Sequence, residues 1–491
     1  MSRRINLWWV LAALLCFPLL NMWLYPLADT TEPRYAEIAR LMAQTGDWIT
    51  PWFEPGVPFW GKPPLSFWME ALSFKLFGVS EFAARLPSWL ATLGTVALLV
   101  AYTRSFFGKR TAQWAAIIYS SCALVYIASG AVMTDSFLAL GTTFSMTAYA
   151  MAARKPTWFW RYGFFAGLAI GLLAKGPLVL VLVAGPIVPW LLWQAPERRT
   201  LRALPWGWGI LLTLAISMPW YILAELKTPG FLNYFIVGEH FKRFIDPGWQ
   251  GDLYGTAHRK AHGTIWLYWV EAAFPWGVLA LGMMAKCLFN VQRRAGLKRV
   301  LHDPVLTYLL AWALFTPLFF TVSGNILWTY ILPALGAFSI LMAVALNTKR
   351  IRVESPKLVQ RAGLMAGIAP LTIVVLTLVV VLRPMQTKTE RDLVQHAQQQ
   401  MHGQERLFYV DSRPFSARFY SNGEAGLLNM NQLPSALNGR EPVYLAIPKS
   451  LVAEASNLIA QPMQKQFENQ RYVLFEVKPK AQLAHAGNPA H

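Results

Sequence analysis

Charged side chains are scarce in this chain of 491 residues: Asp, Glu, Lys and Arg make up 14% of it, whereas apolar residues make up 55%. This balance excludes a soluble domain of ordinary composition, and it equally excludes a disordered chain, which would need more charge and fewer apolar residues. Cysteine is scarcer still, and Cys16, Cys122 and Cys287 all lie within apolar segments, where a thiol behaves as a small hydrophobic group. The sequence therefore shows no disulfide framework and no metal-ligand spacing of cysteines. The composition indicates a polytopic membrane protein.

Apolar runs are what the chain has in abundance, each close to the ~20 residues that cross a bilayer. They predict about eleven transmembrane helices. The runs lie at Leu7–Leu24, Leu86–Tyr102, Trp114–Met133, Phe137–Ala153, Thr157–Ala174, Leu178–Trp193, Trp206–Leu223, Thr264–Met284, Val305–Val322, Ile326–Leu346 and Gly363–Leu382. The first run follows two arginines, as a signal peptide would, but no small-x-small cleavage motif precedes Asp29. We therefore expect it to remain as a membrane anchor.

Basic residues lie mainly on one side of these predicted helices. The formal net charge is +19, and alternate connections, beginning with the N-terminus, hold most of the excess. Their basic residues are Arg3, Arg4, Arg104, Lys109, Arg110, Arg154, Lys155, Arg161, Arg198, Arg199, Arg202, Arg293, Arg294, Lys298, Arg299, Lys349, Arg350, Arg352, Lys357 and Arg361. Such an excess marks cytoplasmic connections, so the basicity indicates topology and predicts no nucleic-acid partner. The N-terminus is then cytoplasmic, and an odd number of helices places the C-terminal tail outside.

Three regions outside the predicted helices are long enough to carry function. The first loop, residues 26–85, contains an amphipathic stretch, Glu37–Met42, and an aromatic-rich segment suited to the membrane interface. The second loop covers residues 224–263. The tail, residues 383–491, is polar and has strand-like runs between short helices, at Leu407–Val410, Val443–Ile447 and Tyr472–Val477. We expect an all-α polytopic membrane domain over residues 1–382, with further helices along its outer face, followed by a small α/β domain.

The end of the first predicted helix carries an unusual group of charges. Asp29 and Glu32 lie three residues apart beside Arg34, where the chain leaves the membrane. A carboxylate there can act as a general base on an acceptor hydroxyl. The structural alternative is that Asp29 or Thr31 caps a helix that begins at Pro33, whose first turn favours acidic residues. The two interpretations are compatible.

Asp135 is the other candidate acid, because it follows a long apolar segment where the third and fourth predicted helices turn on the outer face. An ionisable residue at membrane depth indicates a functional site. The alternative is that Thr134 or Asp135 caps the fourth helix. Glu271 lies inside the eighth predicted helix, where we expect a packing or hydrogen-bonding role.

Several cations lie on the outer face, against the topological bias: Lys62, Lys175, Lys242 and Arg243. Lys62 stands among aromatic and proline residues, and Lys175 lies in a turn too short to reach bulk solvent easily. A lipid phosphate or pyrophosphate would explain these cations, since charge-assisted bonds to phosphate are strong where the dielectric constant is low. Lysines that merely extend toward the interface are the alternative.

The second loop also contains the dipeptide Glu239-His240. Carboxylate and imidazole groups are metal ligands, so the pair is a candidate site for a divalent metal. A single Glu-His pair is a weak pattern, and a site without metal is the alternative. No other pattern in the chain requires a cofactor.

Short motifs follow one another in a set order along the chain. They are Glu32-x-Arg34-Tyr35 continuing to Arg40, Gly46-Asp47-Trp48, Lys62-Pro63-Pro64, Phe77–Pro87, Asp135, Lys175-Gly176-Pro177, Glu239-His240 and Tyr330-Ile331-Leu332-Pro333. This order resembles that of the bacterial aminoarabinose transferase and protein O-mannosyltransferase group of C-type glycosyltransferases. The resemblance covers roughly residues 1–350.

Members of that group take a sugar from a polyprenyl phosphate, such as undecaprenyl phosphate, on the periplasmic face of the bacterial inner membrane. They place it on lipid A, another glycan or a protein. The resemblance implies the same activity here, with the C-terminal domain in the periplasm and no nucleotide site. The implied site residues are Asp29, Glu32 and Asp135 for the acceptor, and Arg34, Lys62, Arg243 and Tyr330 for the donor phosphate.

The chain departs from the group's pattern in three places. Its acids Asp29 and Glu32 are separated, whereas the aminoarabinose enzymes have adjacent Asp-Glu, so either of the two can occupy the catalytic position. Gly61 stands where that subgroup has a glutamate, a candidate metal ligand. Ile326-Leu327-Trp328 replaces an expected Lys-Leu-Pro. These departures bear on lipid A aminoarabinose transfer more than on the reaction class.

Two alternatives belong to other classes of protein. A transporter or flippase of a lipid-linked sugar predicts broken helices and ionisable groups near the bilayer midplane, whereas the charges here gather at the outer rim. A structural subunit of an envelope complex, docking through its tail, would not require an ordered set of loop acids and cations. The sequence favours the transferase.

Overall fold

The computed structural model describes residues 6–246, 248–255, 258–289, 301–347, 356–382, 387–403, 405–437 and 442–478. The chain folds into two compact units. The first contains Met1–Met22 and Met42–Val375, and the second contains Trp23–Leu41 and Leu376–His491. The predicted start of the tail at residue 383 lies outside the described residues, as do the basic residues Arg3, Arg4, Arg293, Arg294, Lys298, Arg299, Lys349, Arg350 and Arg352.

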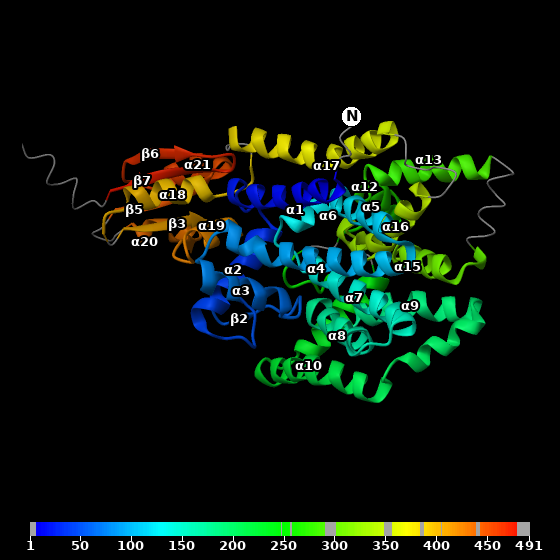
Figure 1. The fold of residues 1–491 in the computed structure, drawn as a ribbon. Coiled ribbons are helices and arrows are strands. Elements are labelled where there is room, and N and C mark those ends of the chain that lie inside the picture. The colour runs from blue at the N-terminus through cyan, green and yellow to red at the C-terminus, as the bar shows by residue number, and fades with distance from the viewer. Residues whose placement is uncertain are drawn as a thin grey trace, which may run out of the picture. The chain divides into compact units, whose positions relative to one another are not determined.

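The first unit is built from helices, with one short antiparallel hairpin, β1 (Trp52–Glu54) and β2 (Val57–Pro58). Its α-helices, seen in Figure 1, are α1 (Leu7–Leu24), α3 (Leu65–Phe77), α4 (Glu81–Phe107), α5 (Lys109–Ser121), α6 (Ala123–Ser129), α7 (Asp135–Arg154), α8 (Trp158–Lys175), α9 (Leu178–Trp193), α10 (Trp206–Lys227), α11 (Arg243–Ile245), α12 (Thr264–Ala272), α13 (Trp276–Leu288), α15 (Pro304–Phe320), α16 (Leu332–Leu346) and α17 (Pro356–Leu382). The ends of α1 and α17 pass into the second unit. Two 3₁₀ segments, η1 (Ala195–Ala203) and η3 (Trp328–Ile331), and a π-helix, η2 (Asn233–Lys242), complete it.

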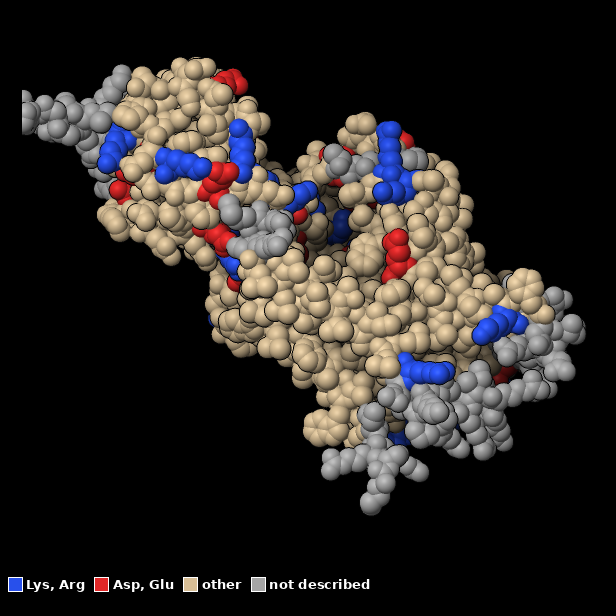
Figure 2. All heavy atoms as spheres, turned by 90° about the horizontal axis from the view of Figure 1, so that it is seen from above, with Lys and Arg blue, Asp and Glu red and all other residues tan. Residues whose placement is uncertain are grey.

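Among the described residues, five helices are long and apolar enough to cross a membrane: α1, α4, α10, the helix of η3 with α16, and α17. The number rises to seven if the bent pairs α5–α6 (73°) and α12–α13 (113°) each count as one span. Two more apolar helices, α9 and α15, are shorter. Broad areas of the face in Figure 2 carry neither acidic nor basic side chains. Several of the predicted apolar runs form short or broken helices, so the count of about eleven spans stays a prediction.

Helices α7 and α8 approach each other more closely than side chains would allow. A Cβ atom on Gly141 of α7 would lie 2.7 Å from the carbonyl oxygen of Gly167 in α8, and a Cβ on Gly167 would lie 2.6 Å from that of Gly141. Small residues permit such backbone contact between membrane helices. The crossing brings the first residue of α7, Asp135, to the last residue of α8, Lys175.

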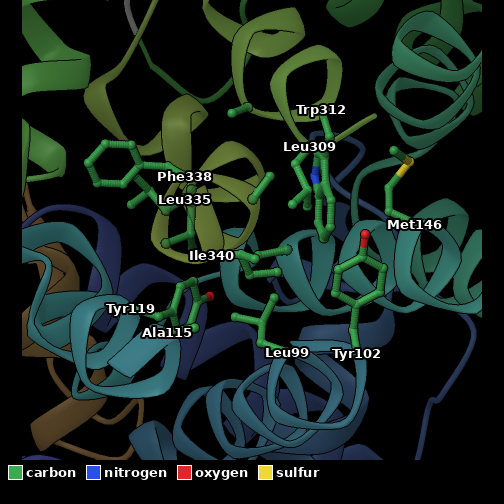
Figure 3. Close-up of a cluster of buried hydrophobic side chains, with 14 of the residues drawn as sticks. Leu99, Tyr102, Ala115, Tyr119, Met146, Leu309, Trp312, Leu335, Phe338 and Ile340 are labelled. Atoms are coloured by element: carbon green, nitrogen blue, oxygen red, sulfur yellow. The ribbon is translucent and has the colours of Figure 1, made fainter. Parts of the chain in front are cut away.

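Aromatic and aliphatic side chains from many of its helices fill the interior of the first unit, and Figure 3 shows part of this core. Tyr102 of α4, Met146 of α7, Trp312 of α15 and Ile340 of α16 are all nearly inaccessible to solvent. The Trp312 indole donates to the Pro333 carbonyl at 3.0 Å, so its polar atom is satisfied inside this core.

The second unit contains a five-stranded sheet in the order β4-β3-β5-β7-β6. Its strands are β3 (Arg406–Val410), β4 (Gly426–Leu428), β5 (Val443–Pro448), β6 (Met463–Glu468) and β7 (Tyr472–Val477), and its helices are α2 (Thr31–Thr45), α18 (Arg391–Gln400), α19 (Phe415–Tyr420), α20 (Leu433–Ala436) and α21 (Val452–Leu458). Strand β3 runs parallel to β4 and β5, whereas β7 is antiparallel to β5 and β6. The predicted α/β fold of the tail and its three predicted strands are present. The two further strands, β4 and β6, are short or mostly polar and lie at the edges of the sheet.

Residues 23–41 belong to the second unit, although they precede the tail by more than three hundred positions. The predicted amphipathic stretch from Glu37 lies in α2, but its charged residues do not face solvent. Arg40 donates to Glu37 at 2.7 Å, and both side chains are almost fully buried.

Candidate active site

A cavity of about 450 Å³ opens within the first unit, bounded by residues of α8, α9, α11, α15, η2 and η3 and the loops beside them. Its polar lining is Lys62, Lys175, Glu239, His240, Arg243, Asn325 and Tyr330. Its apolar lining is Pro177, Leu178, Val181, Phe235, Phe241, Phe244, Ile245, Phe319 and Phe320. The cavity thus joins a charged part to a long apolar part.

Glu239 connects two cations of the cavity. Its carboxylate accepts two hydrogen bonds from Arg243 Nη1, both 3.0 Å, and one from Lys62 Nζ at 3.3 Å. Asp252 lies 3.3 Å from the same Arg243 nitrogen. Burial alone would raise the pKa of Glu239, but the charges of Lys62 and Arg243 hold that pKa below its ordinary value. Glu239 is therefore ionised, and the two cations are partly neutralised by the protein itself.

Two nitrogen donors at this cavity have no acceptor within the described part of the chain. They are Arg243 Nε and Asn325 Nδ2, both buried. A short antiparallel bridge between Arg259 and Asn325 fixes the Asn325 backbone, and its side-chain oxygen accepts from the His258 backbone at 3.1 Å. Buried N–H groups are rarely left unpaired in proteins, so this pair of donors points to a ligand that accepts hydrogen bonds.

Lys175 and Asp135 form a buried ion pair beside the cavity. Lys175 Nζ lies 2.6 Å from Asp135 Oδ1 and 4.9 Å from the centre of the Tyr330 ring. The chain turns sharply after Lys175 because Gly176 has φ +70°, and a Cβ there would lie 2.7 Å from the Phe235 ring. Asp135 begins α7, but Thr134 makes no side-chain cap, and the Asp135 carboxylate accepts from Lys175.

His240 is held by backbone carbonyl groups on both sides of its ring. Nδ1 lies 2.8 Å from the Phe235 oxygen, and Nε2 lies 3.0 Å from the Lys175 oxygen. Burial lowers the pKa of His240 below its ordinary value. Both ring nitrogens thus lie next to carbonyl oxygens, and the Glu239 carboxylate contacts cations. The described residues contain no cluster of three or more possible metal ligands, and the metal-site interpretation of Glu239 and His240 stays a prediction.

The remaining predicted site residues lie in the second unit. Asp29 accepts hydrogen bonds from the Ser416 backbone (2.9 Å) and from the Ser416 hydroxyl (2.5 Å). It also pairs with Arg471 at 2.6 Å, with only 3% of its side chain exposed. Arg34 lies over the rings of Tyr35 and Phe415, 5.2 and 5.7 Å from their centres. Glu32 lies in the first turn of α2 and is half-buried.

The structure therefore brings together Lys62, Glu239, His240, Arg243 and Tyr330 around one cavity, with Asp135 joined to it through Lys175. Asp29, Glu32 and Arg34 belong to the other unit. Sequence analysis missed Asp252 and Asn325. Each is a single polar residue in a loop, and no spacing marks such a residue in advance.

A helical membrane unit with a cation-lined cavity, followed by an α/β unit, defines a protein with the fold of C-type glycosyltransferases. The fold matches the crystal structure of ArnT from Cupriavidus metallidurans bound to undecaprenyl phosphate with a TM-score of 0.78, at 17% identity over 95% of this chain and 97% of that one. It also matches the archaeal oligosaccharyltransferase AglB from Archaeoglobus fulgidus with a TM-score of 0.52, at 11% identity over 91% of this chain and 69% of that one.

Sequence comparison finds relatives in the same class. The family model for dolichyl-phosphate-mannose-protein mannosyltransferase matches residues 1–235. The undecaprenyl phosphate-alpha-4-amino-4-deoxy-L-arabinose arabinosyl transferase of Shewanella sediminis is 32% identical over 344 residues, 69% of this chain and 58% of that protein. The protein of the same name from Yersinia pestis is 30% identical over 380 residues, 74% and 64%. In sequence and in fold, the chain is therefore similar to the aminoarabinose transferase and protein O-mannosyltransferase group of C-type glycosyltransferases. It spans about 58 to 64% of the length of these relatives.

Proposed function

We propose that this protein transfers a sugar from a polyprenyl phosphate donor to an envelope acceptor such as lipid A, another glycan or a protein. The unpaired donors Arg243 Nε and Asn325 Nδ2 carry the proposal, since they share one cavity with Lys62 and a long apolar lining. A phosphate attached to an isoprenoid chain matches both parts of that cavity. The relatives named above are arabinosyl transferases that, by name, use undecaprenyl phosphate, which supports the same class of donor here.

In the proposed reaction, the bond between the sugar's anomeric carbon and the phosphate oxygen breaks. A bond from an acceptor oxygen to the same carbon forms. The acceptor's proton passes to a carboxylate, and the polyprenyl phosphate leaves with an additional negative charge. Lys62, Arg243 and Asn325 would stabilise that charge as it develops, because fixed cations and N–H groups in a partly buried cavity act strongly on it. Tyr330, beside Lys175, would border the phosphate.

The proposed base for the acceptor is an acid of the first loop, with Asp135 as a further member of the site. Between the two first-loop acids we favour Glu32. Both oxygens of Asp29 already accept hydrogen bonds from Ser416 or Arg471, so an acceptor hydroxyl would have to displace one of these partners to reach that carboxylate. Arg34, two residues after Glu32 and over the Phe415 ring, would orient the loop.

Neighbouring cations provide a matched test of the donor cavity. Arg243 lines it, whereas Lys242, next to it in the chain, is exposed and does not. Arg243→Gln should weaken binding of a fluorescent polyprenyl phosphate and lower the rate of sugar transfer by about 100-fold, the usual loss for a charge-stabilising group. Lys242→Gln should leave both near wild type.

The variants are compared in detergent or nanodiscs after their thermal unfolding has been shown to match wild type. Equal losses in both variants would mean that only overall charge matters. Unchanged binding and transfer in Arg243→Gln would overturn the assignment of this cavity to the donor.

A further inference from the structure

A second cavity of about 270 Å³ lies within the first unit, away from the one just described. Its lining is Tyr102, Phe106, Tyr149, Ala150, Ala153, Arg154, Trp190, Glu197, Arg199, Thr200, Pro304, Val305 and Tyr308. None of these residues borders the donor cavity.

Helices α9 and α15 line both cavities, one cavity toward each end, and α7 connects the surroundings of the two. Helix α9 contributes Leu178 and Val181 to the donor cavity and Trp190 to the second, whereas α15 contributes Phe319 and Phe320 to the first and Tyr308 to the second. Helix α7 begins at Asp135, which pairs with donor-cavity Lys175, and ends at Arg154 in the second cavity. A helix of 20 residues is about 30 Å long, close to the thickness of a bilayer core. The nearest lining residues on α9, Val181 and Trp190, are about 14 Å apart along the helix, and those on α15, Tyr308 and Phe319, about 17 Å. The two cavities therefore lie toward opposite ends of these helices.

The second cavity has the chemistry of an anion site with an apolar wall. Arg154 lies 4.6 Å from the centre of the Phe106 ring, and Glu197 faces Arg199 at 3.8 Å. Two arginines against one glutamate leave the lining with one net positive charge. Phe106, Trp190 and Val305 provide the apolar part.

Hydroxyl groups complete this lining. Tyr149 and Thr200 share a hydrogen bond of 2.7 Å. The Tyr102 hydroxyl is buried, and within the described residues it has no hydrogen-bond partner. Figure 3 shows the Tyr102 ring standing out from α4 among the core side chains. A buried phenol without an acceptor is an exception that an acceptor ligand would explain.

We propose that the second cavity binds the phosphodiester of an anionic glycerophospholipid, from the leaflet opposite the donor cavity. A phosphodiester carries one negative charge, which matches the net charge of the lining. Basic pockets between membrane helices on the cytoplasmic side are known to suit such headgroups, and the basic connections Arg154–Arg161 and Arg198–Arg202 mark this side as cytoplasmic by the charge rule. Next to Trp190, the α9 side chains Leu192 and Trp193 are 67% and 72% exposed, so acyl chains have an apolar surface beside the cavity. The proposal does not depend on the transferase assignment.

The test uses the full-length protein in nanodiscs that contain phosphatidylglycerol and phosphatidylcholine in equal amounts. Native mass spectrometry after release counts the lipids that stay bound. Wild type should retain phosphatidylglycerol over phosphatidylcholine by about fivefold, the preference expected from one basic residue near an anionic headgroup. Arg154→Gln and Tyr102→Phe should reduce this preference to less than about twofold. Arg202 is an exposed arginine of η1, the segment that also contains Arg199, but it does not line the cavity. Arg202→Gln should therefore keep the wild-type preference for phosphatidylglycerol.

Thermal unfolding separates loss of the site from loss of the fold, and only variants that melt with wild type are compared. Tyr102→Phe is the conservative change, since it removes one oxygen and no volume of the ring. Equal retention of the two lipids by wild type would overturn the proposal, as would a preference unchanged in both cavity variants. A preference for phosphatidylethanolamine over both lipids, in a second set of nanodiscs, would also overturn it, because Glu197 would then be holding an ammonium group.

Discussion

Glu239 lies between Lys62 and Arg243, the cations that we propose bind the donor phosphate. Its carboxylate is 7% exposed and contacts both cations. A buried cation without a partner is costly, and Glu239 removes that cost while the cavity is empty. Because its pKa lies below the ordinary value of 4.5, the stability that ionised Glu239 contributes is present above about pH 4.5 and is lost as the pH falls through the lowered pKa. At neutral pH, a phosphate must therefore compete with a charged residue.

Glu239→Gln should strengthen binding of polyprenyl phosphate by about fivefold, equivalent to about 1 kcal/mol for one partly screened charge pair. The physical reason is the loss of a competing anion with little change of shape. Fluorescence titration in nanodiscs at neutral pH measures the dissociation constant. Asp252→Asn, which removes an acid that lies 3.3 Å from Arg243, serves as the graded control. Weaker binding by Glu239→Gln would mean that Glu239 positions the cations and does not compete with the phosphate.

At the scale of elements, the N-terminal segment around Asp29 is tied to the edge of the sheet by Arg471. This arginine follows β6 and reaches Asp29 at 2.6 Å and Glu390 at 2.7 Å. Glu390 is fully buried and also accepts from Tyr409 and Asn469. Burial raises the pKa of Glu390 even though Arg471 acts to lower it. One cation thus joins the segment before α2 to the segment before α18.

Arg471→Met should destabilise this unit by about 3 kcal/mol, because it leaves two buried carboxylates without their cation. Hydrogen exchange of residues 23–41 should accelerate, and sugar transfer per folded molecule should fall, since Asp29 is three residues from Glu32. Lys465→Met is the matched control on the same sheet: its ion pair with Glu468 is exposed, and such pairs contribute little. If exchange in residues 23–41 stayed at the wild-type rate, Arg471 would not be the tie between these segments.

The positions of breaks in helices could not be predicted from sequence patterns. The run Trp114–Met133 was expected to be one helix, but it divides at Cys122 into α5 and α6. At the break, the Ala123 N–H donates to the carbonyl of Phe274 at 2.9 Å, and Trp276 donates to Ser121 at 2.9 Å. The bend is held by partners in the α12–α13 pair, about 150 positions away, so hydropathy along one segment could not predict it. The same holds for Asn325, whose role depends on a bridge to Arg259.

The features that the sequence predicted came from the order of apolar runs and motifs along the chain and from the positions of charged residues. The apolar runs correspond to helices, the three tail strands are present, and the family resemblance is confirmed. The motif residues Lys62, Glu239, Arg243 and Tyr330 line one cavity although they are spread over more than 250 positions. The catalytic roles of Asp29, Glu32 and Asp135 stay predictions, because a carboxylate's role depends on an acceptor that no pattern in the chain describes.

For the whole molecule, the charge distribution predicts the side of the membrane on which each end lies. Fusion of alkaline phosphatase after residue 478 should give an active enzyme, because that reporter folds only in the periplasm. Insertion of the same reporter within η1, among Arg198, Arg199 and Arg202, should give an inactive one. Green fluorescent protein at the same two sites should show the opposite pattern. Fluorescence at residue 478 with no phosphatase activity would contradict the expected topology, which rests on the excess of Lys and Arg in alternate connections.

The close crossing of α7 and α8 restricts how this chain can diverge. A Cβ on Gly141 or Gly167 would lie within 2.7 Å of backbone atoms of the opposite helix, so neither position has room for a side chain. Even alanine cannot replace glycine at these two positions unless the helices separate. Separation of the helices would move Asp135 away from Lys175. Substitutions that retune the donor cavity must therefore accumulate elsewhere, on its walls from α9, α11 and α15, while the α7–α8 pair is inherited as a single block.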